Sequence, residues 1–163
     1  MKKYDIYGIG NALVDLVFEV EEDFLKKHAV EKGLMTLVEE DRQNQLISAI
    51  NIQESMMKGG GSAANTVVAA SQFGANCYYS CKVSNDRFGK FYLKDLEANG
   101  VDTKLTEQTA PNGVTGKCLV MTTPDAERTM NTFLGITSDF SPEEIDENAI
   151  KESTYIYSEG YLV

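Results

Sequence analysis

The chain has 163 residues, of which 42% are hydrophobic, so it can bury one sizeable core and one domain is expected. Its formal net charge at pH 7 is −10, which excludes nucleic acid and anionic membranes as partners of the surface as a whole. The sequence contains neither a long apolar run that could span a membrane nor a secretory leader, so we expect a cytoplasmic protein.

Three cysteines and one histidine leave little room for metal or nucleophile chemistry. Cys77 and Cys81 are four positions apart with no second pair, which is a poor spacing for zinc. We therefore expect them to be small core residues and expect no metal site. His28 lies in a polar helical pattern and is expected on the surface.

Two strand patterns open the chain. Residues 4–10 are typical of a buried strand that ends in glycine, and residues 13–20 alternate so that Asp15 falls on the polar side. Gly8 and Gly10 suggest a dinucleotide-binding fingerprint, but the third glycine is missing. A strand pattern also follows where that fingerprint requires a helix, so we do not adopt this interpretation.

The next elements are expected to be two helices, at residues 21–32 and 39–50, with a short apolar segment at 35–38 between them. A glycine-rich stretch follows, with three glycines at 59–61. Three successive glycines permit positive φ and let a ligand approach the main chain closely.

A helix with small residues in its first turn is expected after the glycines, with Ser62 as its N-cap and Gly74 after its end. Such a turn can hold an anion or a cluster of hydroxyl groups. Asn65 would project an amide from the first turn, which suits a polyol. The stretch lacks the Gly-Lys-Ser/Thr ending of a P-loop.

The sequence after Gly74 predicts a strand at 76–83, a helix at 88–98 and extended structure at 101–103. This alternation indicates a parallel sheet flanked by helices, in the α/β class. Two β-rich runs at 116–123 and 127–134 then flank a Pro-Asp turn and predict an antiparallel hairpin. With residues 13–20, the hairpin could form a small separate sheet.

Ser141-Pro-Glu-Glu predicts a helix start, and residues 154–163 predict a further strand. A parallel strand needs a crossover helix to cover it, and none follows. We therefore expect the chain to stop in the middle of a larger fold.

Several short motifs occur in one order along the chain. They are Asn11-x3-Asp15, Gly60-Gly61-x3-Asn65, Gly74, Val83-Ser-Asn-Asp-x-Phe-Gly89 and Glu97-x-x-Gly100-Val-Asp102. Together they resemble the amino-terminal half of the ribokinase and adenosine kinase family, the PfkB-type carbohydrate and nucleoside kinases. The resemblance covers essentially the whole chain. The residues in these motifs are most similar to those of bacterial members described as adenosine kinase or sugar kinase.

The resemblance implies a ribokinase-like α/β fold with a small β-sheet lid. It also implies transfer of the γ-phosphoryl group of ATP, with Mg²⁺, to a primary hydroxyl of a small-molecule nucleoside or sugar. Residues 1–163 would be the N-terminal part of one domain, with lid strands at about 13–20 and 116–134, and the C-terminal ATP-binding half would be absent. The lid also allows a homodimer.

The resemblance also implies a substrate-binding set. Asp15 would accept hydrogen bonds from vicinal hydroxyls, Asn11 and Asn65 would contact the same sugar, and the turn at Gly60 and Gly61 would let it approach. Arg128 would reach toward substrate or phosphate from the lid, or be a solvated charge.

No catalytic residue is expected in this chain, because the base belongs to the family's second half. The 163 residues alone are therefore expected not to turn over. The alternative is a non-catalytic module that binds a sugar or nucleoside, and the choice between adenosine-like and free-sugar substrates stays open.

Overall fold

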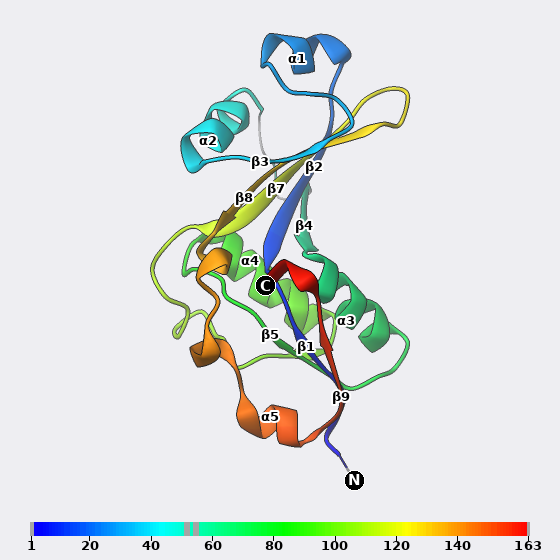
Figure 1. Ribbon diagram of the computed structural model, residues 1–163, viewed down its shortest axis with the longest axis vertical. Coiled ribbons are helices and arrows are strands. Elements are labelled where there is room, and N and C mark those ends of the chain that lie inside the picture. The colour runs from blue at the N-terminus through cyan, green and yellow to red at the C-terminus, as the bar shows by residue number, and fades with distance from the viewer. Residues whose placement is uncertain (1, 51–52, 54–55, 163) are drawn as a thin grey trace.

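The computed structural model describes residues 2–50, 53 and 56–162, and the chain forms two sheets that meet near its middle (Figure 1). One sheet is entirely parallel, and the other contains both parallel and antiparallel pairs. We call them the parallel sheet and the mixed sheet. None of the helices in the described ranges combines the length and apolar character needed to cross a bilayer.

The parallel sheet contains β1 (Tyr4–Ile9), β5 (Cys77–Ser80), β6 (Val101–Asp102) and β9 (Ser153–Ser158), in the order β6-β5-β1-β9. Successive residues of β5 face opposite sides, as in any strand, so Cys77 and Tyr79 pack into the main core while Tyr78 packs with Tyr4 and Tyr7. Helices α3 (Ser62–Gln72) and α4 (Arg87–Ala98) cover the first face, and α5 (Glu147–Lys151) covers the second.

The mixed sheet has five strands in the order β3-β8-β7-β2-β4. These are β2 (Leu13–Glu19), β3 (Met35–Leu37), β4 (Met57–Gly60), β7 (Thr115–Thr122) and β8 (Arg128–Gly135). Strand β2 pairs in parallel with β7 and antiparallel with β4, so it has a neighbour on each side. Helices α1 (Glu22–Lys27) and α2 (Glu40–Ser48) lie beside this sheet at the top of Figure 1.

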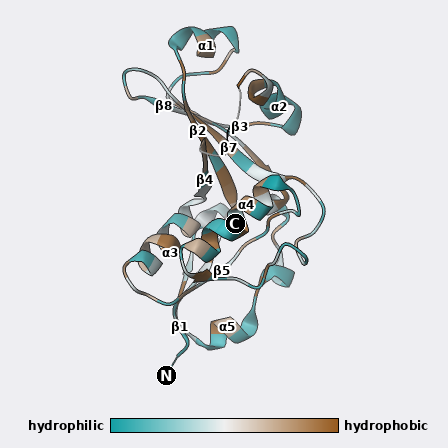
Figure 2. Ribbon diagram, turned by 180° about the vertical axis from the view of Figure 1, so that it is seen from behind, coloured by the Kyte–Doolittle hydropathy of each residue, from teal (hydrophilic) through white to brown (hydrophobic). Residues whose placement is uncertain are grey.

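One hydrophobic core runs through both sheets. It joins Val14, Leu16 and Phe18 of β2 to Leu119 and Met121 of β7, and continues to the α3 and α4 side chains below. In Figure 2, hydrophobic colouring gathers in the strands near this junction, while α1 and α5 are mostly hydrophilic. The alternation of β2 therefore buries one row of side chains and leaves Asp15 on the opposite face.

The expected parallel sheet, the antiparallel hairpin and the separate sheet containing residues 13–20 are confirmed. Both cysteines of the Cys77–Cys81 pair are buried and reduced. The helix expected at 21–32 is shorter and ends at Lys27, because Ala29 adopts a positive φ of 49°. The approach to the glycines at 53–58, as far as it is described, contains a strand, β4, that was not predicted.

Three further boundaries differ from expectation. Ser62 is the first helical residue of α3 and not its N-cap, which is Gly61. Ser141 caps only a 3₁₀ turn, η3 (Pro142–Glu144), through a capping box, and α5 begins later at the Asp146 cap. The last strand ends at Ser158 and a 3₁₀ turn, η4 (Gly160–Leu162), follows; Val163 lies outside the described residues.

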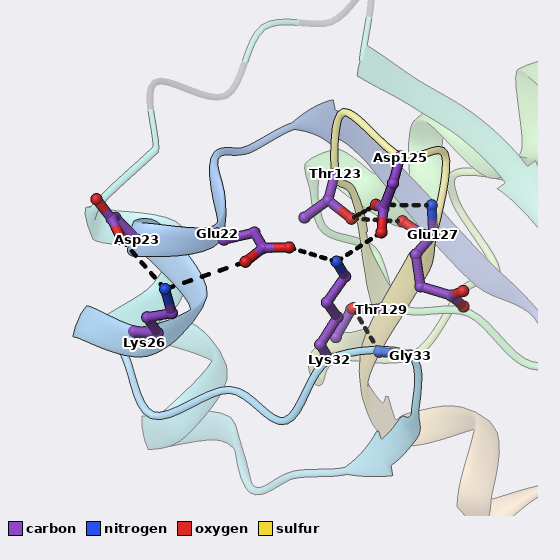
Figure 3. A network of polar contacts seen from close by, with 9 residues as sticks. All are labelled: Glu22, Asp23, Lys26, Lys32, Gly33, Thr123, Asp125, Glu127 and Thr129. Carbon is purple, nitrogen blue, oxygen red and sulfur yellow. Dashed lines mark hydrogen bonds and ion pairs between the residues drawn. The ribbon is translucent and has the colours of Figure 1, made fainter.

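A charged network ties the loop after α1 to the β7–β8 turn (Figure 3). The Lys32 ammonium donates to Glu22 Oε1 at 2.6 Å and to Asp125 Oδ2 at 2.7 Å. Asp125 Oδ1 also accepts the Thr123 hydroxyl at 2.6 Å, and the Gly33 amide donates to Thr129 Oγ1 at 2.9 Å. The hydrogen bonds from Lys32 and Thr123 hold the pKa of the Asp125 carboxyl well below its usual range.

We predict that Lys32→Met loosens the β7–β8 turn, measured as faster amide hydrogen exchange at Glu127 and Gly33. The stabilisation of the turn by the Lys32–Asp125 ion pair is present above the ordinary Asp pKa of about 4. It is lost as pH falls below that value, because protonation of Asp125 removes its charge. Lys26→Met is the matched control, since Lys26 pairs with Glu22 and Asp23 of its own helix and with no other acidic residue that the structure describes. Equal exchange in the two variants would contradict the prediction.

Candidate functional site

Four candidate residues, Asn11, Asp15, Gly60 and Gly61, gather where the chain crosses between the two sheets. The segment 10–12 connects β1 to β2, and the Gly60–Gly61 step connects β4 to α3. Both crossings occur beside β2, which carries Asp15 as its third residue. Residues up to fifty positions apart in sequence therefore come together at one end of the mixed sheet.

Asn11 and Gly61 are in main-chain contact. A Cβ atom at Gly61 would lie 2.2 Å from the Asn11 carbonyl oxygen, and Gly61 has φ of +100°. Only glycine satisfies both conditions without displacing the backbone. The Asn11 side-chain oxygen accepts the Thr137 hydroxyl at 3.4 Å, and Thr137 Oγ1 in turn accepts the Ala12 amide at 2.9 Å. These contacts fix the Asn11 side chain at the crossing.

The Asp15 carboxylate lies directly over Gly60. A Cβ atom at Gly60 would stand 2.5 Å from Asp15 Oδ1, so the close approach depends on the missing side chain. In the ladder, Asp15 is paired with Lys58 on β4 and with Cys118 on β7. Gly60, Gly61 and Asp15 thus form one polar corner, which we call the glycine corner. A carboxylate at this turn repels phosphate and favours hydroxyl donors.

Asp15 is half-buried, and its carboxylate accepts no hydrogen bond from any residue that the structure describes. Burial raises the pKa of Asp15 to about 6, and the positive charge of Arg128 opposes that rise. An unpaired, partly desolvated carboxylate is costly for a fold, and such groups concentrate at functional sites. The carboxylate oxygens of Asp15 are therefore free of hydrogen bonds from the described residues.

Asn65 and Arg128 lie at the margins of this corner. Asn65 is exposed in the first turn of α3, where its main-chain N–H donates to the Gly61 carbonyl at 2.9 Å. Arg128 is exposed at the start of β8, close enough for its charge to act on both Asp15 and Cys118. The structure thus brings together Asn11, Asp15, Gly60 and Gly61 closely, with Asn65 and Arg128 farther out.

A row of side chains continues from Asp15 across the mixed sheet, in which Cys118 and Thr132 are buried and Leu37 is 60% exposed. The register places Cys118, Thr132 and Leu37 in successive strands along one row. The next row passes through Leu13 and Gly116, where a Cβ atom at Gly116 would meet Leu13 Cδ2 at 2.6 Å. Beyond it, a depression of about 260 Å³ is lined by residues that include Leu37, Thr132 and Leu134.

Three buried residues that sequence reasoning missed hold this corner from below. The Tyr79 hydroxyl donates to the Asn11 carbonyl at 3.0 Å, and the Tyr92 hydroxyl donates to the Gly60 carbonyl at 3.1 Å. Thr137 is fully buried and contacts Asn11 and Ala12 of the first crossing. The sequence signals only that Tyr79 and Tyr92 are core residues, because the partners of their hydroxyls are set by tertiary structure.

Comparisons with known proteins show the family and the fold of the chain. The profile of the pfkB family carbohydrate kinases matches residues 34–163. A ribokinase from Mus musculus is 30% identical over 90 residues, which cover 55% of this chain and 28% of the mouse protein. Adenosine kinase 2 from Arabidopsis thaliana is 24% identical over 169 residues. The match covers 97% of this chain and 47% of the Arabidopsis protein.

Among solved structures, adenosine kinase from Sinorhizobium meliloti superposes with a TM-score of 0.83 at 34% identity, over 98% of this chain and 48% of that one. A probable sugar kinase from Rhizobium etli CFN 42 has a TM-score of 0.83 at 30% identity, over 99% of this chain and 48% of that one. The chain thus spans about half the length of these solved relatives. It has the ribokinase-like fold and belongs to the pfkB family of carbohydrate kinases.

Proposed function

We propose that the protein takes part in ATP-dependent phosphoryl transfer to a primary hydroxyl of a nucleoside or sugar, and that this chain supplies the acceptor side and the lid. The observation that carries the proposal is the half-buried Asp15 carboxylate, which has no partner among the described residues and lies against the glycine corner. The kinase relatives support the reaction class.

The chemistry of the corner suits a ribose ring. A carboxylate can accept hydrogen bonds from two adjacent hydroxyls at once, and Asp15 has both oxygens available. The Asn11 amide can donate to the same ring, and the missing side chains at Gly60 and Gly61 let the ring approach the main chain. Asn65 would contact the ring from α3. Arg128 would approach substrate or the transferred phosphate.

We favour a nucleoside of the adenosine type over a free sugar. The apolar rows through Leu13 and Leu134 and through Leu37 begin next to the proposed ribose site, where a base would extend from the ring. A free sugar would leave this surface uncovered. Adenosine kinases among the relatives support the same choice.

The described residues do not form a preassembled metal centre. They contain no group of three or more His, Cys, Asp or Glu side chains that could hold a metal by themselves, whereas the magnesium of ATP is held largely by phosphates and water. The glycine corner faces a carboxylate and is therefore unsuited to a phosphate chain. We derive no step through ATP or Mg²⁺ from these residues, and we expect the 163-residue chain to bind acceptor without releasing ADP.

The mixed sheet would act as the lid that excludes water from the acceptor. The face of this sheet that carries Asp15 also exposes Val17, Met35 and Leu37, whose exposed fractions are 40%, 52% and 60%. A second copy could cover that face, which is the homodimer allowed by the family resemblance. We place the protein in the cytoplasm, where nucleosides and ATP are both available.

The proposal is tested by calorimetric titration of the chain with adenosine, inosine, ribose and fructose, beside an assay for ADP release. Binding of a nucleoside without ADP release is the expected result. ADP release by the chain would contradict the proposal that this chain supplies only the acceptor side and the lid. Binding of none of the four ligands would contradict the acceptor site. Intact mass of the protein in its source cell separates a kinase from the alternative, a stand-alone binding module.

Asp15→Asn should weaken binding of the preferred ligand at least tenfold, because an amide loses one of the two acceptor oxygens. The same change should raise the melting temperature at pH 7.5, since it removes a desolvated charge. Glu19→Gln is the control, because it removes an exposed carboxylate from the same face of β2. Lower stability with unchanged binding would make Asp15 a structural residue.

Binding should strengthen as pH rises through about 6, the pKa of Asp15, and level off near pH 7.5. The raised pKa has the opposite effect on folding. Stability should increase as pH falls from 7 toward 4, because the folded chain binds the proton more tightly than the unfolded one. Titrations at several pH values with wild type and Asp15→Asn test both trends, and an unchanged profile in the variant would refute them.

Gly61→Ala should reduce ligand binding and stability together. Its Cβ atom would overlap the Asn11 carbonyl, and φ of +100° is strained for alanine. Gly74→Ala is the control, since Gly74 also has a positive φ, of 96°, but has open space around its Cβ position. Normal affinity in Gly61→Ala with a loss in Gly74→Ala would remove the glycine corner from the site.

A further inference from the structure

Helix α4 is joined by hydrogen bonds to both strands that flank β2. On one side, the Tyr92 hydroxyl donates to the Gly60 carbonyl of β4 at 3.1 Å. Tyr92 is only 1% exposed, so its ring position is set by close packing and its hydroxyl has no access to bulk water. The hydrogen bond therefore anchors the last residue of β4 to the body of the domain.

On the other side, Asp86 joins the start of α4 to the start of β7. Its carboxylate caps the helix by accepting the Gly89 amide at 2.8 Å. The same carboxylate accepts the Thr115 amide at 2.9 Å and the Thr115 hydroxyl at 2.7 Å. Thr115 is fully buried and is the first residue of β7. One side chain thus satisfies both the helix end and the beginning of the strand.

The strand between these two anchors is β2, which pairs with β4 through Asp15–Lys58 and with β7 through Asp15–Cys118. We propose that Tyr92 and Asp86 are positioning residues for the acceptor site, which fix β4 and β7 on α4 so that Asp15 is held against Gly60. This inference rests on the proposed function for its binding readout, and on the geometry alone for its structural readout.

The physical reason lies in how Asp15 is desolvated. Gly60 covers the carboxylate because the register of β4 with β2 places Gly60 two residues along the strand from the Asp15–Lys58 pair. Loss of the Tyr92 hydroxyl would leave the buried Gly60 carbonyl without that donor, so β4 would move to reach water. Asp15 would then be more hydrated and less well oriented, although the core would be unchanged.

The decisive experiment compares Tyr92→Phe with Tyr78→Phe in the full chain. Tyr78 is also buried, at 5% exposed, and its hydroxyl donates to Asp146 Oδ2 at 2.9 Å on the opposite face of the parallel sheet. Each variant loses one tyrosine hydroxyl and keeps its ring. Both should lose a similar amount of stability, so a purely structural role for Tyr92 would not separate them.

The first readout is the pKa of Asp15, measured by NMR titration of its carboxyl carbon without ligand. In Tyr92→Phe it should fall from about 6 toward the ordinary value of about 4, and in Tyr78→Phe it should stay at the wild-type value. The charge of Arg128 on β8 lowers the pKa of Asp15, and the charge of Asp15 in turn raises the pKa of Cys118 on β7 and of Tyr92 on α4. An equal pKa in both variants would overturn the proposal.

The second readout is nucleoside binding by calorimetry. Tyr92→Phe should weaken binding about fivefold or more, and Tyr78→Phe should bind as wild type does. Asp86→Asn should act like Tyr92→Phe, because asparagine still caps α4 but places an N–H₂ group against the Thr115 amide. Unchanged binding and an unchanged Asp15 pKa in Asp86→Asn would remove Asp86 from the role.

These outcomes separate the two proposals. If wild type binds no nucleoside or sugar, the proposed function fails, and the ligand-free pKa comparison still decides whether Tyr92 and Asp86 position Asp15. If wild type binds and the pKa of Asp15 does not respond to Tyr92→Phe, the acceptor site stands and the positioning role is refuted.

Discussion

The contact between the Gly61 backbone and the Asn11 carbonyl sets the geometry of the whole site. Two crossings between the sheets pass each other there, at a separation that leaves no room for a Cβ atom. Because the crossings touch through main-chain atoms, neither can shift without the other. Asn11, Gly60 and Asp15 inherit their relative positions from that contact, and Tyr79 and Thr137 maintain it from the core.

Asp15 is the residue whose burial in this arrangement is unfavourable for folding. A half-buried carboxylate without an internal partner reduces the stability of the fold at neutral pH, as its raised pKa indicates. An apolar or amide side chain would be the more stable choice at that position. Under the proposed function, a carboxylate is retained there because its two unoccupied oxygens can accept hydrogen bonds from hydroxyl groups of the substrate. The surrounding core compensates, with Val14 and Leu16 fully buried on the opposite face of the strand.

The charged network around Lys32 plays a different part from that of Asp15. It lies at the exposed end of the β7–β8 hairpin, far along the strands from the glycine corner, and its groups are paired (Figure 3). Exposed ion pairs of this kind contribute little to global stability. Their effect is local, because they connect a short helix to a turn that otherwise has few buried side chains.

Sequence reasoning predicted the elements with strong periodicity and missed those that depend on partners. The alternation of residues 13–20 and the β-rich runs of the hairpin identified three strands of the mixed sheet. Strand β4 was missed because glycines have low strand propensity, and its pairing with β2 overrides that preference. The helix expected at Ser141 forms only one 3₁₀ turn, since the capping box has no continuous apolar face behind it.

The sequence by itself determined the α/β class, the family and the residue types of the corner, because periodicity and ordered motifs are local properties of the chain. Only the tertiary structure decided that Gly60 lies under the Asp15 carboxylate, that Asp15 has no partner among the described residues, and that α4 binds both strands beside it. These facts depend on strand order and register, which arise from packing between distant segments and leave no periodic trace in the sequence.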